Sequence, residues 1–149
     1  MNFRGHERVG IDSNVLIYLV EDDARFGLSA GQILDAVAIG EAAAVLSTLV
    51  LTEVCSGPRY VDDPALVARV ADDIRSLENT TVVPVSAEIA VDAAVLRGWQ
   101  QLSMTDAIHL ASARSAGATA FVTNDRRIKP LPQLDVIYLD ELDQRKPEL

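Results

Sequence analysis

The chain has 149 residues and a mass of 16.1 kDa, the size of one compact domain that buries about 70% of its unfolded surface. Apolar residues make up 49% of it and charged residues 23%, which is typical of globular proteins and argues against disorder. Its one cysteine, Cys55, excludes an intramolecular disulfide framework and a cysteine-rich zinc site. The formal net charge of −9 excludes binding of nucleic acid by bulk positive charge, so any such activity needs another way to offset phosphate repulsion.

We expect a single domain over residues 1–149, with a frayed, charged ending from about residue 143. The first ten residues contain no apolar stretch of the kind found in signal peptides. No segment approaches the roughly 18 apolar residues that cross a membrane. These patterns predict a cytoplasmic protein without a membrane partner.

Short apolar segments alternate with longer amphipathic ones, which predicts strands alternating with helices. The predicted strands are 9–11, 44–46, 81–85, 120–122 and 135–139. The predicted helices run from Ser13 or Asn14 through Leu19, over 28–39, from Ser47 or Thr48 to Gly57-Pro58, over 64–77, from Ser86 onward, and from Ser103 to Gly117. This alternation is typical of a parallel sheet covered on both faces, so we predict a three-layer α/β/α sandwich with about five strands.

The predicted order of elements places four acidic residues near the ends of strands or the starts of helices. Asp12 comes directly after the first strand, Glu53 lies in the helix after the second, and Asp125 follows the fourth. Asp106 lies in the first turn of a helix that must begin at the same edge, because its end leads into the start of the fourth strand. Functional crevices of such sheets lie beyond the carboxyl ends of the strands. The four acids are therefore predicted to meet there.

Each acid also has a purely structural interpretation. Asp12 suits a helix cap, Asp106 forms a Ser-x-x-Asp capping pattern, and Asp125 suits a turn. Glu53 lies among apolar residues and needs a partner. A shared site explains the position of all four acids at one edge, whereas the structural interpretation needs a separate reason for each. Two carboxylates ~5 Å apart repel by roughly 3 kcal/mol at an effective dielectric of 20, so such a cluster requires cations. Oxygen ligands favour Mg²⁺ or Mn²⁺, and two such ions promote phosphodiester hydrolysis.

Four segments in this order resemble the PIN-domain family, and together they cover nearly the whole chain. They are residues 9–18 (VGIDSNVLIY), 47–54 (STLVLTEV), 102–113 (LSMTDAIHLASA) and 121–125 (FVTND). The resemblance implies an endoribonuclease that depends on one or two Mg²⁺ or Mn²⁺ ions. Its small single-domain form is similar to VapC-type toxins, which implies a homodimer and a cognate antitoxin whose tail blocks the active cleft.

The resemblance also implies roles for individual residues. The metal-binding and catalytic acids carry over onto Asp12, Glu53, Asp106 and Asp125. The supporting polar positions are Ser13, Thr123 and Asn124, with Ser13 in place of the commoner threonine. Three basic residues after Asp125 are equally consistent with RNA phosphate binding at the rim and with a solvated turn, namely Arg126, Arg127 and Lys129. His109, one turn after Asp106, is expected to pack beneath the site rather than to take a direct part.

Three other functions stay open on sequence grounds. A PIN-type nuclease with a housekeeping role in RNA processing has the same residues as a toxin. A binding module without catalysis would use the acids to hold a structural ion or a basic partner. An aspartyl-phosphate phosphatase is disfavoured, because its Asp-x-Asp motif would require a second acid where Asn14 stands.

Overall fold

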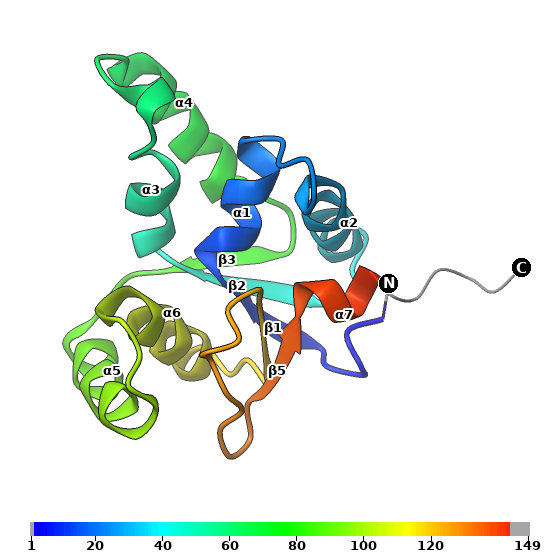
Figure 1. The fold of residues 1–149 in the computed structure, drawn as a ribbon, viewed down its shortest axis with the longest axis vertical. Coiled ribbons are helices and arrows are strands. Elements are labelled where there is room, and N and C mark those ends of the chain that lie inside the picture. The colour runs from blue at the N-terminus through cyan, green and yellow to red at the C-terminus, as the bar shows by residue number, and fades with distance from the viewer. Residues whose placement is uncertain (1, 144–149) are drawn as a thin grey trace, which may run out of the picture.

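The computed structural model describes residues 2–143, in which a five-stranded parallel sheet lies between two layers of helices (Figure 1). The strands are β1 (Arg8–Ile11), β2 (Ala43–Ser47), β3 (Thr80–Val83), β4 (Ala120–Thr123) and β5 (Asp135–Tyr138). Their order across the sheet is β3-β2-β1-β4-β5, and every neighbouring pair is parallel. The three-layer sandwich predicted from the sequence is confirmed.

The helices divide between the two faces of the sheet. They are α1 (Ser13–Val20), α2 (Gly27–Ala38), α3 (Leu49–Val54), η1 (Pro58–Tyr60), α4 (Pro64–Arg75), α5 (Ala87–Gln100), α6 (Met104–Ser115) and α7 (Leu139–Asp143). Helices α1, α2 and α7 cover one face and α5 and α6 the other, each layer with its own apolar cluster (Figure 1). No helix in residues 2–143 is long and apolar enough to cross a membrane.

Several boundaries differ from those predicted. The N-cap of α1 is Asp12, whose carboxylate accepts from the Ser13 amide at 2.8 Å, so capping by Ser13 or Asn14 was wrong. Helix α3 ends at Val54, short of the expected Gly57. Strand β3 stops at Val83, before Pro84, which has no amide hydrogen to extend a ladder. These shifts leave the order of elements unchanged.

Neither η1 nor α7 was predicted. Residue 143, where fraying was expected to begin, is the last residue of α7, and residues 144–149 lie outside the described part of the chain. Leu139 anchors α7 because it is fully buried. Arg126 pairs with Asp140 and Glu141 of the same helix. Short helices held by such tertiary contacts have weak sequence signals.

Gly10 in β1 allows α6 to approach the sheet closely. A Cβ atom at Gly10 would lie 2.4 Å from the Ala113 Cβ and 2.8 Å from Cδ2 of Phe121. Both neighbours are buried in the core between the sheet and α6. The missing side chain of Gly10 therefore sets the height at which α6 rests on β1.

The sheet has one topological switch point, at the carboxyl ends of β1 and β4. The chain passes from β1 outward through β2 to β3, and then crosses to the other side of β1 to form β4 and β5. Ile11 and Val122 are paired there, so the loops after β1 and β4 begin side by side at the carboxyl edge, where open parallel sheets have their ligand crevice. Asp12 and Thr123 lie at this crevice.

Candidate active site

Asp12 is the most deeply buried acid of the site, with 2% of its surface exposed. Its Oδ1 accepts from the Ser13 amide at 2.8 Å and its Oδ2 from the Thr123 hydroxyl at 2.7 Å. Burial raises the pKa of Asp12 to about 6, and the charge of Asp106 adds to the rise, although His109, Thr123 and Ser13 oppose it. Because burial disfavours the negative charge of Asp12, a cation bound beside it would stabilise the ionised carboxylate.

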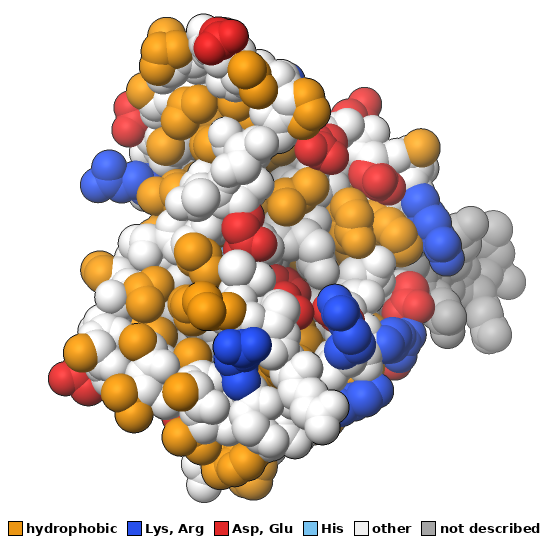
Figure 2. All heavy atoms as spheres, turned by 60° about the vertical axis from the view of Figure 1, so that its left-hand side comes forward, with side chains coloured by type: hydrophobic (Ala, Val, Ile, Leu, Met, Phe, Trp, Pro, Cys, Tyr) orange, Lys and Arg blue, Asp and Glu red, His pale blue; other side chains and the backbone are white. Residues whose placement is uncertain are grey.

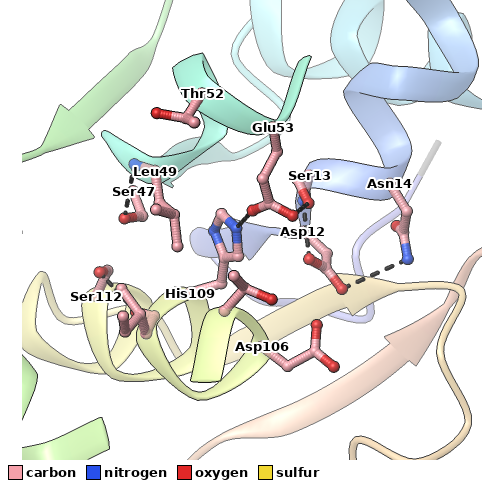
Figure 3. A network of polar contacts seen from close by, with 12 residues as sticks. Asp12, Ser13, Asn14, Ser47, Leu49, Thr52, Glu53, Asp106, His109 and Ser112 are labelled. Carbon is pink, nitrogen blue, oxygen red and sulfur yellow. Dashed lines mark hydrogen bonds and ion pairs between the residues drawn. The ribbon is translucent and has the colours of Figure 1, made fainter. Parts of the chain in front are cut away.

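Glu53 reaches the crevice from α3 (Figure 3). Its Oε2 accepts from the Ser13 hydroxyl at 3.1 Å, and its Oε1 hydrogen bonds to Nε2 of the buried His109. Partial burial acts to raise the pKa of Glu53, but the hydrogen bond and charge of His109, with the Ser13 bond, outweigh it and lower the pKa. Glu53 is therefore ionised at neutral pH. These two donors are the partners that its apolar setting required.

Asp106 lies in the first turn of α6, where the Ser103 hydroxyl caps the helix by accepting from the Asp106 amide at 3.2 Å. The predicted capping role is thus real, yet it involves the backbone and leaves the carboxylate at the crevice (Figure 3). Burial raises the pKa of Asp106, and the charge of Asp125 raises it further, against the effects of Ser103, Arg127 and His109. Capping and a site role therefore coexist in one residue.

Asp125 follows β4 and is held by Arg127. The Arg127 side chain donates to both carboxylate oxygens of Asp125, with Nε at 3.0 Å from Oδ1 and Nη2 at 2.8 Å from Oδ2. These bonds are the main reason that the pKa of Asp125 is lowered, and a bond to Asp106 acts in the same direction. The backbone amide of Asp125 donates to the Thr123 hydroxyl at 3.0 Å, which links Asp125 to the residue that supports Asp12.

A sequence profile of the PIN domain matches residues 9–134. The chain belongs to the PIN-domain family. A comparison with curated protein sequences gives no significant match.

Solved structures similar in fold include several toxin–antitoxin proteins. VapBC2 of Rickettsia felis, bound to a DNA fragment from its promoter, is 18% identical, with 88% of this chain and 98% of that chain covered and a TM-score of 0.66. A toxin–antitoxin complex from Klebsiella pneumoniae is 22% identical, with 85% and 94% covered and a TM-score of 0.63. VapC20 of Mycobacterium tuberculosis, a toxin that cleaves the sarcin–ricin loop, is 19% identical, with 76% and 86% covered and a TM-score of 0.58. These likenesses establish the fold.

The PIN domain brings most of its predicted site residues to the switch point. Ser13 joins Asp12 to Glu53, and Asp106 interacts with both Asp12 and Asp125. Of the supporting residues, Thr123 and Ser13 contact the acids, whereas the Asn124 amide donates to the Tyr18 hydroxyl at 3.2 Å. The three predicted basic residues also differ in their partners. Arg127 pairs with Asp125, Arg126 pairs with α7 and stacks on Tyr138, and Lys129 bonds to Gln100 through its backbone.

Asn14 is a site residue that the sequence reading treated only as a possible cap. Its Nδ2 lies 3.4 Å from both the Asp12 carboxylate and the Thr123 hydroxyl, while its Oδ1 is buried and has no hydrogen-bond partner within residues 2–143. Asn14 lies two residues after Asp12, in the first turn of α1, and that turn faces the end of β4. This position in the sequence could have indicated that Asn14 lies at the site. An unsatisfied amide oxygen at this place adds one more acceptor to an acidic crevice.

The carboxylates of this PIN domain fit a hydrated divalent cation rather than a closed cage. Among residues 2–143 no three His, Cys, Asp or Glu side chains converge as a ready set of ligands. Mg²⁺ keeps several waters and is usually bound through one or two protein carboxylates together with substrate phosphates. Asp12 and Asp106 are suited to that task, because both have raised pKa values and the charge of Asp106 contributes to the raised pKa of Asp12.

Proposed function

We propose that the protein is a Mg²⁺- or Mn²⁺-dependent endoribonuclease, most similar in kind to the toxins of VapBC-type toxin–antitoxin pairs. The observation that carries the proposal is Asp12, a carboxylate 2% exposed with a pKa raised to about 6, beside Asp106 at the switch point of the sheet. An acid buried for a structural role is usually paired with a basic residue. Asp12 is instead buried beside the carboxylate of Asp106, an arrangement that a divalent ion would stabilise. The match to a toxin that cleaves an RNA loop supports the choice of RNA.

In this proposal Asp12 and Asp106 hold one or two ions, and Glu53 and Asp125 complete the set directly or through water. A divalent ion at such a site activates water for in-line attack on a phosphodiester and stabilises the leaving oxygen. Ser13 and Thr123 keep the Asp12 carboxylate in one orientation through its hydrogen bonds. No covalent intermediate with the protein is needed.

Basic side chains beside the acids give an RNA backbone a place to bind. In Figure 2 acidic side chains lie along the middle of the face, and Lys and Arg side chains lie next to them. We assign the first phosphate contact to Arg127, which is 78% exposed and already touches a site acid, with Lys129 as a second. Arg126 is a weaker candidate, because two acids of α7 already engage it.

A cognate antitoxin and a second copy of the chain are the proposed protein partners. The structures of R. felis and K. pneumoniae are toxin–antitoxin assemblies, and they support the first of these. Helix α5 leaves Val91 68% exposed and Trp99 62% exposed, which suits burial against another protein. Gel filtration of the purified chain with light scattering tests the homodimer.

The test of function is cleavage of a labelled RNA by purified protein. We expect cleavage with Mg²⁺ or Mn²⁺, none in EDTA, and loss of cleavage in Asp12→Ala. Expression should halt bacterial growth, and Asp12→Ala should relieve the arrest. Cleavage without growth arrest would indicate a housekeeping nuclease. Metal binding without cleavage of any RNA offered would indicate a non-catalytic module and overturn the proposal.

A further inference from the structure

His109 is buried beneath the acids, with 1% of its side chain exposed. It lies on α6, one turn beyond Asp106, among the apolar residues that pack this helix against the sheet. Its Nε2 contacts Oε1 of Glu53, and its Nδ1 is buried with no hydrogen-bond partner among the described residues. Glu53 is thus the one side chain to which this imidazole is hydrogen bonded in residues 2–143.

The direction of the bond follows from the chemistry of its two ends. A glutamate carboxylate is ordinarily ionised at neutral pH, so its oxygens only accept hydrogen bonds. The proton of the bond therefore belongs to Nε2 of His109, which donates. The other carboxylate oxygen, Oε2, accepts from the Ser13 hydroxyl. One donor from α6 and one from α1 thus fix both oxygens of Glu53 (Figure 3).

Helix α3 alone gives Glu53 little support. It has six residues, and its N-cap Thr48 makes no side-chain capping bond. A helix this short has low intrinsic stability. By contrast, α6 has twelve residues and packs against both α5 and the sheet. The bond from His109 therefore ties the side chain of Glu53 to a longer helix than its own.

We infer that His109 is a positioning residue, which holds the Glu53 carboxylate facing Asp12 and so sets the divalent-ion affinity of the site. The inference rests on the proposed function. It assigns to His109 a role outside the ion's own ligands, because a donor that orients a ligating carboxylate strengthens the site without touching the ion. A histidine needed only for packing would have no use for this one polar contact, because an apolar side chain of similar size fills the same space.

The test measures Mn²⁺ binding to the full chain by calorimetry and by the loss of the free-Mn²⁺ electron paramagnetic resonance signal. His109→Leu keeps volume and removes the donor, and we expect the Mn²⁺ dissociation constant to rise about 10- to 100-fold. His109→Gln places an amide donor near the position of Nε2, so its affinity should stay within about threefold of the parent. His109→Asn is too short to reach Glu53 and should resemble His109→Leu.

A double-variant cycle with Glu53→Gln identifies the route of the effect. If His109 acts through Glu53, His109→Leu should cause no further loss of affinity in the Glu53→Gln background, since effects on one interaction are not additive. Losses that multiply in the double variant would overturn the inference, as would parental Mn²⁺ affinity in His109→Leu. If His109→Leu fails to fold, the comparison of His109→Gln with His109→Asn decides, and equal affinities for the two overturn the inference.

Asp12→Asn separates this inference from the proposed function. If Asp12→Asn loses Mn²⁺ binding and His109→Leu does not, the site stands and the role of His109 is wrong. If Asp12→Asn binds Mn²⁺ like the parent, the proposed ion site itself is wrong, whatever the His109 variants do. Loss of affinity in Asp12→Asn and His109→Leu, with retention in His109→Gln, supports both.

Discussion

The two edges of the sheet differ in how completely their charged side chains are paired. At the amino-terminal edge His6 bridges Thr119, at 2.7 Å, and Asp135, at 2.9 Å, while Arg8 donates to the Ala116 carbonyl at 2.8 Å. The Asp135 side chain is 68% exposed, so water also solvates its charge. His6, Asp135 and Arg8 thus each have a complementary partner, as expected of contacts that only close a fold.

At the carboxyl edge Glu53 is bonded to His109 and Asp125 to Arg127. Asp12 and Asp106 lie near each other, and neither forms an ion pair with a basic residue in residues 2–143. A rise in the pKa of Asp12 from 3.8 to about 6 corresponds to about 3 kcal/mol of unfavourable charge burial at neutral pH. Chains keep such destabilised arrangements where a ligand relieves them. This difference between the edges supports the proposed site at the carboxyl edge.

The largest expected effect is on RNA cleavage, and it is seen by comparing the same Asp→Asn substitution made separately at each edge. Asp106→Asn removes a carboxylate proposed to hold the ion, so we expect RNA cleavage to fall about 100-fold or more. Asp135→Asn alters an acid of the amino-terminal edge and should leave cleavage within about twofold of the parent. Single-turnover rates at saturating Mg²⁺ measure both. Equal losses in the two variants would show that the edges do not differ in function.

The next effect concerns stability and pH. Because the folded-state pKa of Asp12, about 6, lies above the unfolded value of 3.8, the folded protein binds this proton more tightly than the unfolded chain between these values. The free energy of unfolding therefore falls as the pH rises through this window, by about 3 kcal/mol in total. Asp12→Asn lacks this titration. It should become more stable than the parent above pH 6, and the gap should close below pH 4.

Urea unfolding without divalent ions, at a series of pH values, measures this gap. Asp135→Asn serves again as the control from the opposite edge. Adding Mg²⁺ should stabilise the parent and leave Asp12→Asn unchanged, because a ligand that binds only the folded state stabilises it by mass action. A pH-independent difference between Asp12→Asn and the parent would contradict the assigned burial of charge.

A third prediction concerns the close packing that sets the carboxyl edge. Gly10→Ala would place a methyl group 2.4 Å from the Ala113 Cβ, so α6 must shift, at a cost of about 1–3 kcal/mol. Gly98→Ala in α5 has nothing within 4 Å of the new atom and should be neutral or stabilising by up to about 1 kcal/mol. Urea unfolding compares the two, and equal stabilities would show that α6 is free to move away from β1.

The order of the five strands and of the longer helices was predictable from the sequence, whereas η1 and α7 were not. Alternating patterns define strands and helices, and a parallel sheet leaves little choice of where Asp12, Asp106 and Asp125 emerge. The N-caps at Thr48, Ser86 and Ser103 agree with the prediction, and only the N-cap of α1 was harder to predict. Asp12, Ser13 and Asn14 are all good capping residues, and only the bond from the Ser13 amide, at 2.8 Å, selects Asp12.

Contacts between distant residues were beyond what local patterns specify. Glu53 was seen to need a partner, but nothing in the order of residues states that His109, 56 positions away, supplies it. The pairing of Arg126 with α7 depends in the same way on a helix that forms through tertiary contacts. The sequence therefore predicts which residues lie at the ends of strands, while the pairing of long side chains depends on the packed structure.

The smallest effect should separate the two adjacent arginines. Without an ion, Arg127 is the main positive charge on Asp125 and lowers its pKa. If the proposed ion neutralises the carboxyl edge, we expect that guanidinium to bind an RNA phosphate, whereas Arg126 should stay paired with α7. We expect Arg127→Gln to raise the KM for RNA about threefold at 0.1 M salt and to reduce the slope of log KM against log salt by roughly 0.7, the value for one single-strand phosphate contact. Arg126→Gln should leave that slope unchanged. If both arginines alter the slope equally, the engagement of Arg126 by Asp140 and Glu141 does not persist when RNA binds, and the basic turn acts as one surface rather than as two residues with separate partners.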